Sequence, residues 1–239
     1  MPDLRSHRGA HPEDAQLFNR DRWPVLQNAA GELWWLLDRG YALRSSLALV
    51  GDRHELRQRQ RLALARGSCT AAQVGSRASR HVVPLALQGA ELWIDGYNQL
   101  ITLEAALAGG ILIRGRDGCC RDMASLHGSY RRVEETVPAL KLLGAWQAVA
   151  GVSTIRWILD RPVANSGRLR ALIEELARES GWNWIVALEP SPDAVLTRSP
   201  AVVASSDSVV LDRCERWCNV TDSILQRLDQ EPEVLVLAS

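Results

Sequence analysis

The chain has 239 residues, 46% of them hydrophobic and 23% charged, and its 28 basic side chains balance its 28 acidic ones. This composition excludes an intrinsically disordered chain, and the lack of any run of about 20 apolar residues excludes a membrane-spanning helix. The first thirty residues carry no apolar signal core, and the five cysteines show no disulfide-framework spacing. We therefore expect a globular, cytoplasmic protein with reduced thiols and no membrane association.

The neutral net charge hides an uneven distribution. Residues 1–80 hold 13 arginines against eight acidic residues, so the remainder of the chain is acidic. Eight of these arginines lie in residues 44–80, beside only two acidic residues. A basic segment of this kind is typical of a surface that binds a polyanion, although a solvated helix face explains it equally well.

The first part of the chain predicts a small helical domain. Residues 1–20 are polar and predict a loose tail. Helical periodicity begins at Pro24, and Gly40 suits a cap that ends the first helix. In chain order, helices are expected over residues 24–37, 45–50 and 55–66. Residues 21–67 thus predict an arginine-rich helical domain, and the small, polar residues 68–84 predict a linker.

From residue 85 onward, predicted strands alternate with predicted helices. Short apolar runs predict strands over residues 92–95, 111–113, 154–159, 182–188, 201–204 and 234–237. Helices are expected over residues 99–108, 136–149, 167–178 and 221–228. This alternation is typical of βαβ units, so we expect residues 85–239 to form one α/β domain with a mostly parallel sheet flanked by helices.

Aspartates lie where the predicted strands end. Asp95 and Asp160 close two strands, Asp207 follows a third, and Asp193 precedes that third strand. The carboxyl ends of parallel strands meet at one edge of the sheet, where ligands bind. Crowded carboxylates repel one another unless a cation is bound, and oxygen ligands favour Mg²⁺ or Mn²⁺ over zinc. The pattern therefore predicts a divalent-metal site at this edge.

Four segments around these aspartates occur in a recognisable order. They are Ile94-Asp95-Gly96-Tyr97-Asn98, Leu159-Asp160, Pro192-Asp193-Ala194-Val195-Leu196 and Val203-Ala204-Ser205-Ser206-Asp207. In this order they resemble the NYN branch of the PIN-like nuclease superfamily. Two positions depart from that family's pattern: Ala194 replaces the second acid of its Ala-Asp-Asp segment, and Ser205 replaces a threonine.

The resemblance implies a PIN-like fold and the hydrolysis of phosphodiesters, in RNA, by water that Mg²⁺ or Mn²⁺ activates. It implies that the catalytic acids are Asp95, Asp160, Asp193 and Asp207. Among these, Asp95, Asp193 and Asp207 are the expected metal ligands. The missing acid at Ala194 keeps an alternative open, namely a catalytically silent module of the same fold that binds nucleic acid or a protein.

Further residues near the predicted edge are candidates for substrate binding. They are Asn98, Arg121, Asp122, Asn165 and Ser206. Arg121 is expected to contact a phosphate, but Asp117-Gly118 between apolar strands also predicts a β-hairpin for its segment. In the helical domain the candidates for contact with nucleic acid are Arg53, Arg57, Arg59 and Arg61. That domain is also the expected surface for a protein partner.

Overall fold

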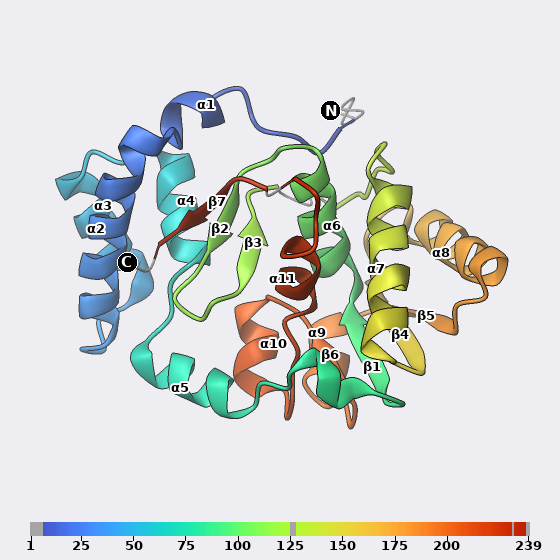
Figure 1. Ribbon diagram of the computed structural model, residues 1–239. Coiled ribbons are helices and arrows are strands. Elements are labelled where there is room, and N and C mark those ends of the chain that lie inside the picture. The colour runs from blue at the N-terminus through green and yellow to red at the C-terminus, as the bar shows by residue number, and fades with distance from the viewer. Residues whose placement is uncertain (1–6, 125–127, 231, 238–239) are drawn as a thin grey trace.

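A computed structural model describes residues 7–124, 128–230 and 232–237 (Figure 1). The strands of the main sheet are β1 (Glu91–Asp95), β4 (Thr154–Asp160), β5 (Trp184–Glu189) and β6 (Val202–Ala204). They are parallel and lie in the order β5-β4-β1-β6. A smaller sheet contains β2 (Leu112–Arg114), β3 (Cys120–Asp122) and β7 (Val234–Val236). In it, β2 is antiparallel to β3 and parallel to β7.

Helices cover both sheets. In the N-terminal region they are α1 (Asp14–Leu17), α2 (Trp23–Leu37), α3 (Leu43–Arg53), α4 (Gln58–Arg66) and α5 (Ala71–Ser79). After β1 they are α6 (Gly96–Leu107), α7 (Thr136–Ala150), α8 (Ser166–Ser180), α9 (Pro192–Leu196), α10 (Ser208–Arg213) and α11 (Val220–Leu225). The prediction of a mixed α/β fold with a helix-flanked parallel sheet and an N-terminal helical region is confirmed. Within the described residues, no helix combines the length and apolarity needed to cross a bilayer.

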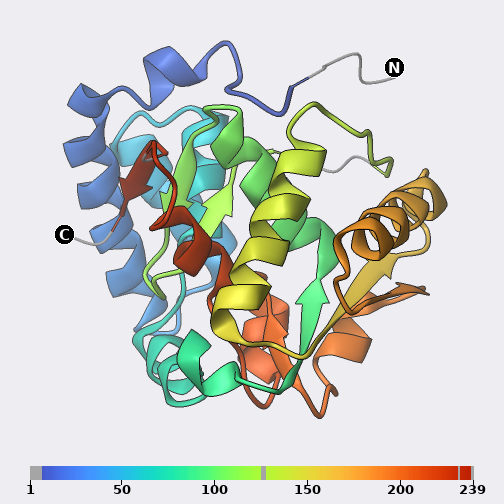
Figure 2. The same ribbon diagram turned by 45° about the vertical axis from the view of Figure 1, so that its right-hand side comes forward.

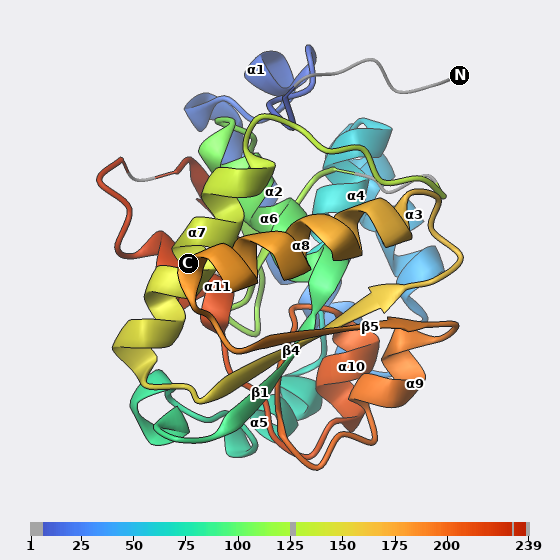
Figure 3. The same ribbon diagram turned by 90° about the vertical axis from the view of Figure 1, so that its right-hand side faces the viewer.

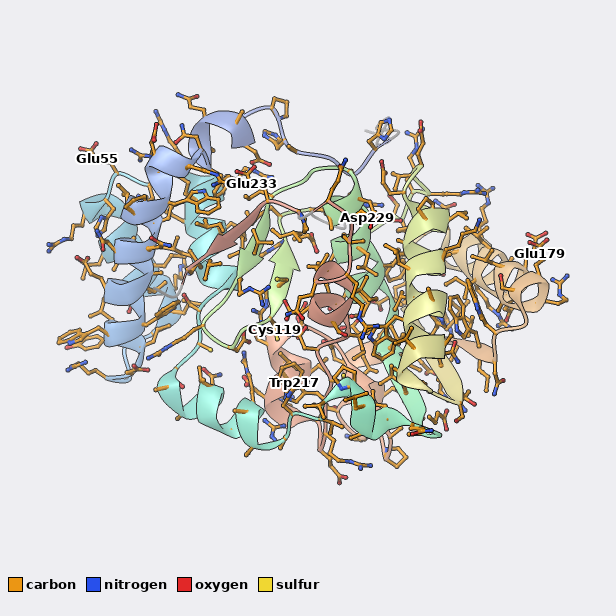
Figure 4. The ribbon with its side chains drawn as sticks, viewed as in Figure 1. Glu55, Cys119, Glu179, Trp217, Asp229 and Glu233 are labelled. Carbon is orange, nitrogen blue, oxygen red and sulfur yellow. The ribbon has the colours of Figure 1, made fainter. Side chains whose placement is uncertain are left out.

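The main sheet is buried on both faces. Successive side chains of a strand point to opposite faces, and the strands of this sheet carry apolar side chains toward each. Leu92 and Trp157 belong to the core under α6, α7 and α8. Ile158 and Val203 belong to the core on the opposite face, under α9 and α10. Figure 3 shows α8 across one face of β4 and β5, with α9 and α10 on the other. Cys119 and Trp217, both labelled in Figure 4, also pack into this second core.

The N-terminal helices and the smaller sheet share a core. Leu26 of α2 and Leu64 of α4 are buried in one cluster with Ile113 of β2 and Leu235 of β7. Figure 2 shows β7 running beside α2, and the Gln27 side-chain amide donates a hydrogen bond to the Val236 carbonyl at 2.9 Å. The N-terminal helical region is therefore packed directly on strands β2 and β7 of the smaller sheet.

The polar tail is held more firmly than its composition predicts. Asp14 and Phe18 are buried, and Arg59 of α4 donates to both carboxylate oxygens of Asp14. Farther toward the N-terminus, Arg8 Nε lies 2.6 Å from the buried carboxylate of Glu104 on α6. These charged pairs fix residues 8–18, so the expectation of a loose tail does not hold for them. Residues 1–6 lie outside the described residues.

The expected linker contains helix α5. Thr70 caps it by accepting a hydrogen bond from the Gln73 amide, and the Gln73 side chain accepts one from the Thr70 amide. Arg77 is 1% exposed and lies between Asp117 and Asp212, which come from the β2–β3 hairpin and α10. The small residues of this segment thus form a docked helix rather than a flexible connection.

Asp117 also pairs with Arg121, whose Nη2 lies 2.6 Å away, so one buried carboxylate bridges two buried guanidinium groups and Asp212 supplies the second negative charge. We expect Asp117→Asn to lower the free energy of unfolding by about 3–5 kcal/mol, because it leaves those cations undercompensated. Urea denaturation followed by circular dichroism measures this change. Asp52→Asn is the control: its side chain is 75% exposed, and its pair with Arg61 should contribute under about 1 kcal/mol. Equal small losses would show that the Asp117 network does not hold α5.

Candidate functional site

The first strand delivers Asp95 directly to the carboxyl edge of the main sheet. Helix α6 begins at Gly96, so no loop separates strand from helix. A Cβ at Gly96 would lie 2.5 Å from Leu159 Cδ2 and 3.0 Å from the Ile158 carbonyl oxygen. Glycine is therefore needed for α6 to start this close to β4. As a result, the Asp95 carboxyl group is held in a buried position at the edge.

The loop after β6 is fastened to the same place. Ser205 Oγ donates a hydrogen bond to Asp95 Oδ2 at 2.7 Å. Asn98 Oδ1 accepts from both the amide and the hydroxyl of Ser206, at 2.8 and 3.0 Å. Asp207 caps α10 by accepting from the Val209 and Val210 amides. Ser206, Asn98 and Asp207 thus join the β6 loop to the first turn of α6.

Four aspartates, which we name the acid edge, influence one another electrostatically: Asp95, Asp160, Asp193 and Asp207. Burial raises the pKa of Asp95 to about 7, and the charges of Asp207 and Asp193 add to this shift. Burial, followed by the charge of Asp207, raises the pKa of Asp193. Burial, followed by the charge of Asp193, raises the pKa of Asp160. The fold therefore brings these four predicted acids into one electrostatic neighbourhood.

The donor chemistry of the acid edge fits a hard divalent cation. Ser205 occupies one oxygen of Asp95, and α10 amides occupy one oxygen of Asp207, so the second oxygen of each lies outside these bonds. No group of three or more His, Cys, Asp or Glu side chains within the described ranges is arranged to hold a metal ion. Binding a metal would therefore require the acid side chains to move closer together.

A cavity of about 310 Å³ adjoins the acid edge on the side of α6 and α10. Its lining comprises Arg66, Tyr97, Asn98, Ile101, Arg121, Asp122, Ala124, Ser206, Asp207 and Ser208. Asp122, at the end of β3, accepts hydrogen bonds from the Thr102 hydroxyl and the Ala124 amide, and burial raises its pKa. Arg66 Nη1 donates to the carbonyls of Asp122 and Ala124. The cavity thus places two arginines, of which Arg66 lies 3.7 Å from Asp122, close to the acid edge.

Arg121 has a structural role beside its predicted phosphate contact. It is 8% exposed, pairs with Asp117, and donates from Nε to the Ser206 carbonyl at 2.8 Å. Its segment forms the β2–β3 hairpin, with Gly118 at a φ of +79° in the turn. Arg121 lines the cavity, and its guanidinium holds the hairpin against the β6 loop; its contact with a phosphate stays a prediction.

Asn165 lies beyond the other end of the acid edge. It precedes α8 with a φ of +71°, and its side-chain amide donates to the Tyr130 carbonyl at 3.0 Å. It therefore does not share the cavity that contains Asn98, Asp122 and Ser206.

Most of the candidate arginines in the helical region serve the fold. Arg59 pairs with the buried Asp14, and Arg61 pairs with Asp52 at 2.7 Å while donating to the Leu56 carbonyl. The exposed Arg53 lies 3.3 Å from Glu32. Arg57 is exposed at the start of α4. Ion pairing between short helices thus accounts for much of the arginine enrichment predicted to bind nucleic acid.

Three residues of the site had no assigned role in the predictions: Tyr97, Ser205 and Arg66. Tyr97 and Ser205 lie inside the segments that carry the family resemblance, so their position was the available signal. The Tyr97 hydroxyl is buried without a hydrogen-bond partner in the described parts of the chain, and burial and the Asp160 charge raise its pKa. Arg66 reaches Asp122 only through tertiary packing, which the local sequence does not reveal.

The acid edge predicts a pH-dependent stability in metal-free buffer. The Asp95 pKa rises from 3.8 to about 7 on folding. Between these values the folded state retains a proton that the unfolded state has lost. The free energy of unfolding should therefore fall by up to about 1.4 kcal/mol per pH unit as the pH rises through this window, and level off above it. Denaturation of wild type and Asp95→Asn with EDTA present measures this; parallel pH profiles would contradict it.

Comparison with known proteins gives two family matches. Residues 84–223 match "Domain of unknown function (DUF5616)", and residues 25–80 match "Protein of unknown function (DUF434)". The chain is also 26% identical over 204 residues to "Uncharacterized protein MJ0935" of Methanocaldococcus jannaschii, an alignment covering 85% of this chain and 97% of that protein. No solved structure gives a significant match. Because the first match spans more than half of its length, the chain belongs to the DUF5616 family.

Proposed function

We propose that this protein is a divalent-metal-dependent nuclease that hydrolyses phosphodiesters in RNA. The observation that carries the proposal is the acid edge, which gathers four aspartates from β1, β4, α9 and the β6 loop. The charge of Asp207 raises the pKa values of Asp95 and Asp193, and the charge of Asp193 raises those of Asp95 and Asp160. A fold gains no stability by crowding like charges at partly buried positions, so the cluster is better explained by a cationic ligand.

Each residue of the edge has a defined task in this proposal. Asp95, Asp193 and Asp207 would hold Mg²⁺ or Mn²⁺, which supplies water activation and neutralises charge on the phosphate. Ser205 orients the Asp95 carboxylate through its hydrogen bond, and Asn98 fixes the loop that carries Asp207. Asp160 adds a fourth carboxylate near Asp193 for binding or orienting water. Ala194 leaves the position after Asp193 without a carboxylate, so these four form the proposed set.

The adjoining cavity supports a nucleotide substrate. It joins hydrogen-bonding groups of Asn98 and Ser206 to the guanidinium of Arg66 beside the apolar Ile101. A site that combines a cation, polar groups and an apolar wall suits a nucleotide next to the cleaved phosphate. The cavity thus lies where the proposed chemistry needs a substrate subsite.

Mn²⁺ binding tests the metal part of the proposal. Calorimetry should show binding by wild type and its loss in Asp207→Asn, since asparagine removes the charge yet still caps α10. Ser205→Ala should weaken Mn²⁺ binding by about 10- to 100-fold, because it removes the hydrogen bond that orients Asp95. Glu179→Gln is the charge-matched control, at the exposed outer end of α8 (Figure 4). Equal affinities in all four proteins would place any bound metal elsewhere.

Cleavage tests the reaction itself. Asp95→Asn should abolish Mn²⁺-dependent cleavage of single-stranded RNA while circular dichroism stays unchanged, because it removes a proposed metal ligand without changing side-chain size. Electrophoresis of a labelled oligonucleotide measures the rate. Glu179→Gln should cleave like wild type. RNA binding by wild type without cleavage in any divalent metal would instead support the catalytically silent binding module.

A further inference from the structure

A second cavity, which we name the arginine cavity, has no role in the proposed metal chemistry. Its volume is about 360 Å³, and it is lined by Tyr130, Arg131, Arg132, Asn165, Arg168, Leu169 and Leu172. The three arginines are exposed, and this lining contains no carboxylate. Leu169 is buried and Leu172 half-buried, so the guanidinium groups stand over an apolar floor on α8. A cavity of this composition suits an anion with an attached apolar part.

The arginine cavity lies near the cavity that adjoins the acid edge. Residues 128–130 run beside residue 164, where the Tyr130 amide donates to the Ala164 carbonyl and the Ala164 amide donates to the Gly128 carbonyl. The centre of the Tyr130 ring lies 5.4 Å from that of the Tyr97 ring. Tyr97 follows Asp95 by two residues in the chain. Tyr97 lines the cavity beside the acid edge, and Tyr130 lines the arginine cavity. Two packed tyrosine rings thus lie between the two cavities.

The charges of Arg132 and Arg168 are not used in holding the fold together. Among the described side chains, neither forms an ion pair with an acid. Of the acids nearest to them in the chain, Glu134 and Glu135 lie near His7, and Glu174 pairs with Arg170 at 2.8 Å. Arg132 and Arg168 are thus exposed cations beside a cavity whose lining contains no carboxylate. That arrangement favours an external anion as the missing partner.

We propose that the arginine cavity binds the phosphodiester backbone of a single-stranded nucleic acid on one flank of the acid edge. This proposal rests on the proposed function, since it assigns a subsite to the same substrate. Arg132 and Arg168 contact phosphates, and the apolar floor supports a ribose or a base. Arg66 lines the other cavity beside the acid edge, 3.7 Å from Asp122, so the strand would extend from the arginine cavity toward that pair.

Binding can be measured without cleavage. Fluorescence anisotropy of a labelled oligouridylate, with EDTA present, should show that the double variant Arg132→Gln/Arg168→Gln binds at least about tenfold more weakly at low salt. The slope of log affinity against log salt should fall by about 0.7 for each phosphate that the variant no longer neutralises. Arg178→Gln is the matched control, because this exposed arginine lies at the opposite end of α8. It should bind like wild type.

The outcomes separate this subsite from the nuclease proposal. If the double variant binds RNA more weakly than wild type and Arg178→Gln do, and wild type does not cleave RNA, the result would support the arginine cavity and reject the nuclease. Cleavage by wild type with unchanged binding in the double variant would do the reverse. Absence of RNA binding by wild type would overturn the subsite, as would displacement of RNA by polyglutamate at equal charge, which would indicate an acidic polypeptide as the partner.

Discussion

The burial of carboxyl groups at the acid edge is the constraint on which the rest of the site depends. Burial raises the pKa values of Asp95, Asp193 and Asp160, and the charges of neighbouring aspartates raise them further, so ionising these groups costs free energy in the folded chain. Neutral donors, rather than cations, hold the carboxylates in place: the Ser205 hydroxyl contacts Asp95, and backbone amides of α10 contact Asp207. Neutral donors position an acid without cancelling its charge. In the proposed metal site, these charges would remain available to a cation.

The cations that the chain does bury are used one layer farther out. Arg121 holds the β6 loop through the Ser206 carbonyl, and Asp117 and Asp212 together balance the charges of Arg121 and Arg77 of α5. An unpaired Arg121 would place a positive charge beside the carboxylates of the proposed metal site. Its pairing with Asp117 lets a guanidinium support the loop within a neutral group of four side chains. The hairpin and α5 thus hold the β6 loop in place without adding net charge beside the acid edge.

Local sequence predicted the parts of this arrangement that local physics determines. Strand ends at Asp95 and Asp160 follow from short apolar runs, and parallel βαβ order places them at one edge. The helix expected from residue 99 begins instead at Gly96, and the helix α10 that Asp207 caps was not predicted, because its six residues are too few to show a helical period. Charge pairing over long sequence distances was not predictable, because a side chain's charge does not identify its partner. Arg59 was therefore predicted to contact nucleic acid, although in the fold it forms an ion pair with Asp14.

The same long-range packing determines what counts as one structural unit. The two family matches divide the chain near residue 80, yet helices of the first segment share their core with β2 of the second. Strand β7 lies beyond the match to residues 84–223, pairs with β2, and buries Leu235 against those helices. A fragment of residues 84–223 would expose this face of β2 and release the hairpin that carries Arg121 and Asp122. Because Arg121 holds the β6 loop, the acid edge depends on residues from both matched segments and from the C-terminal strand.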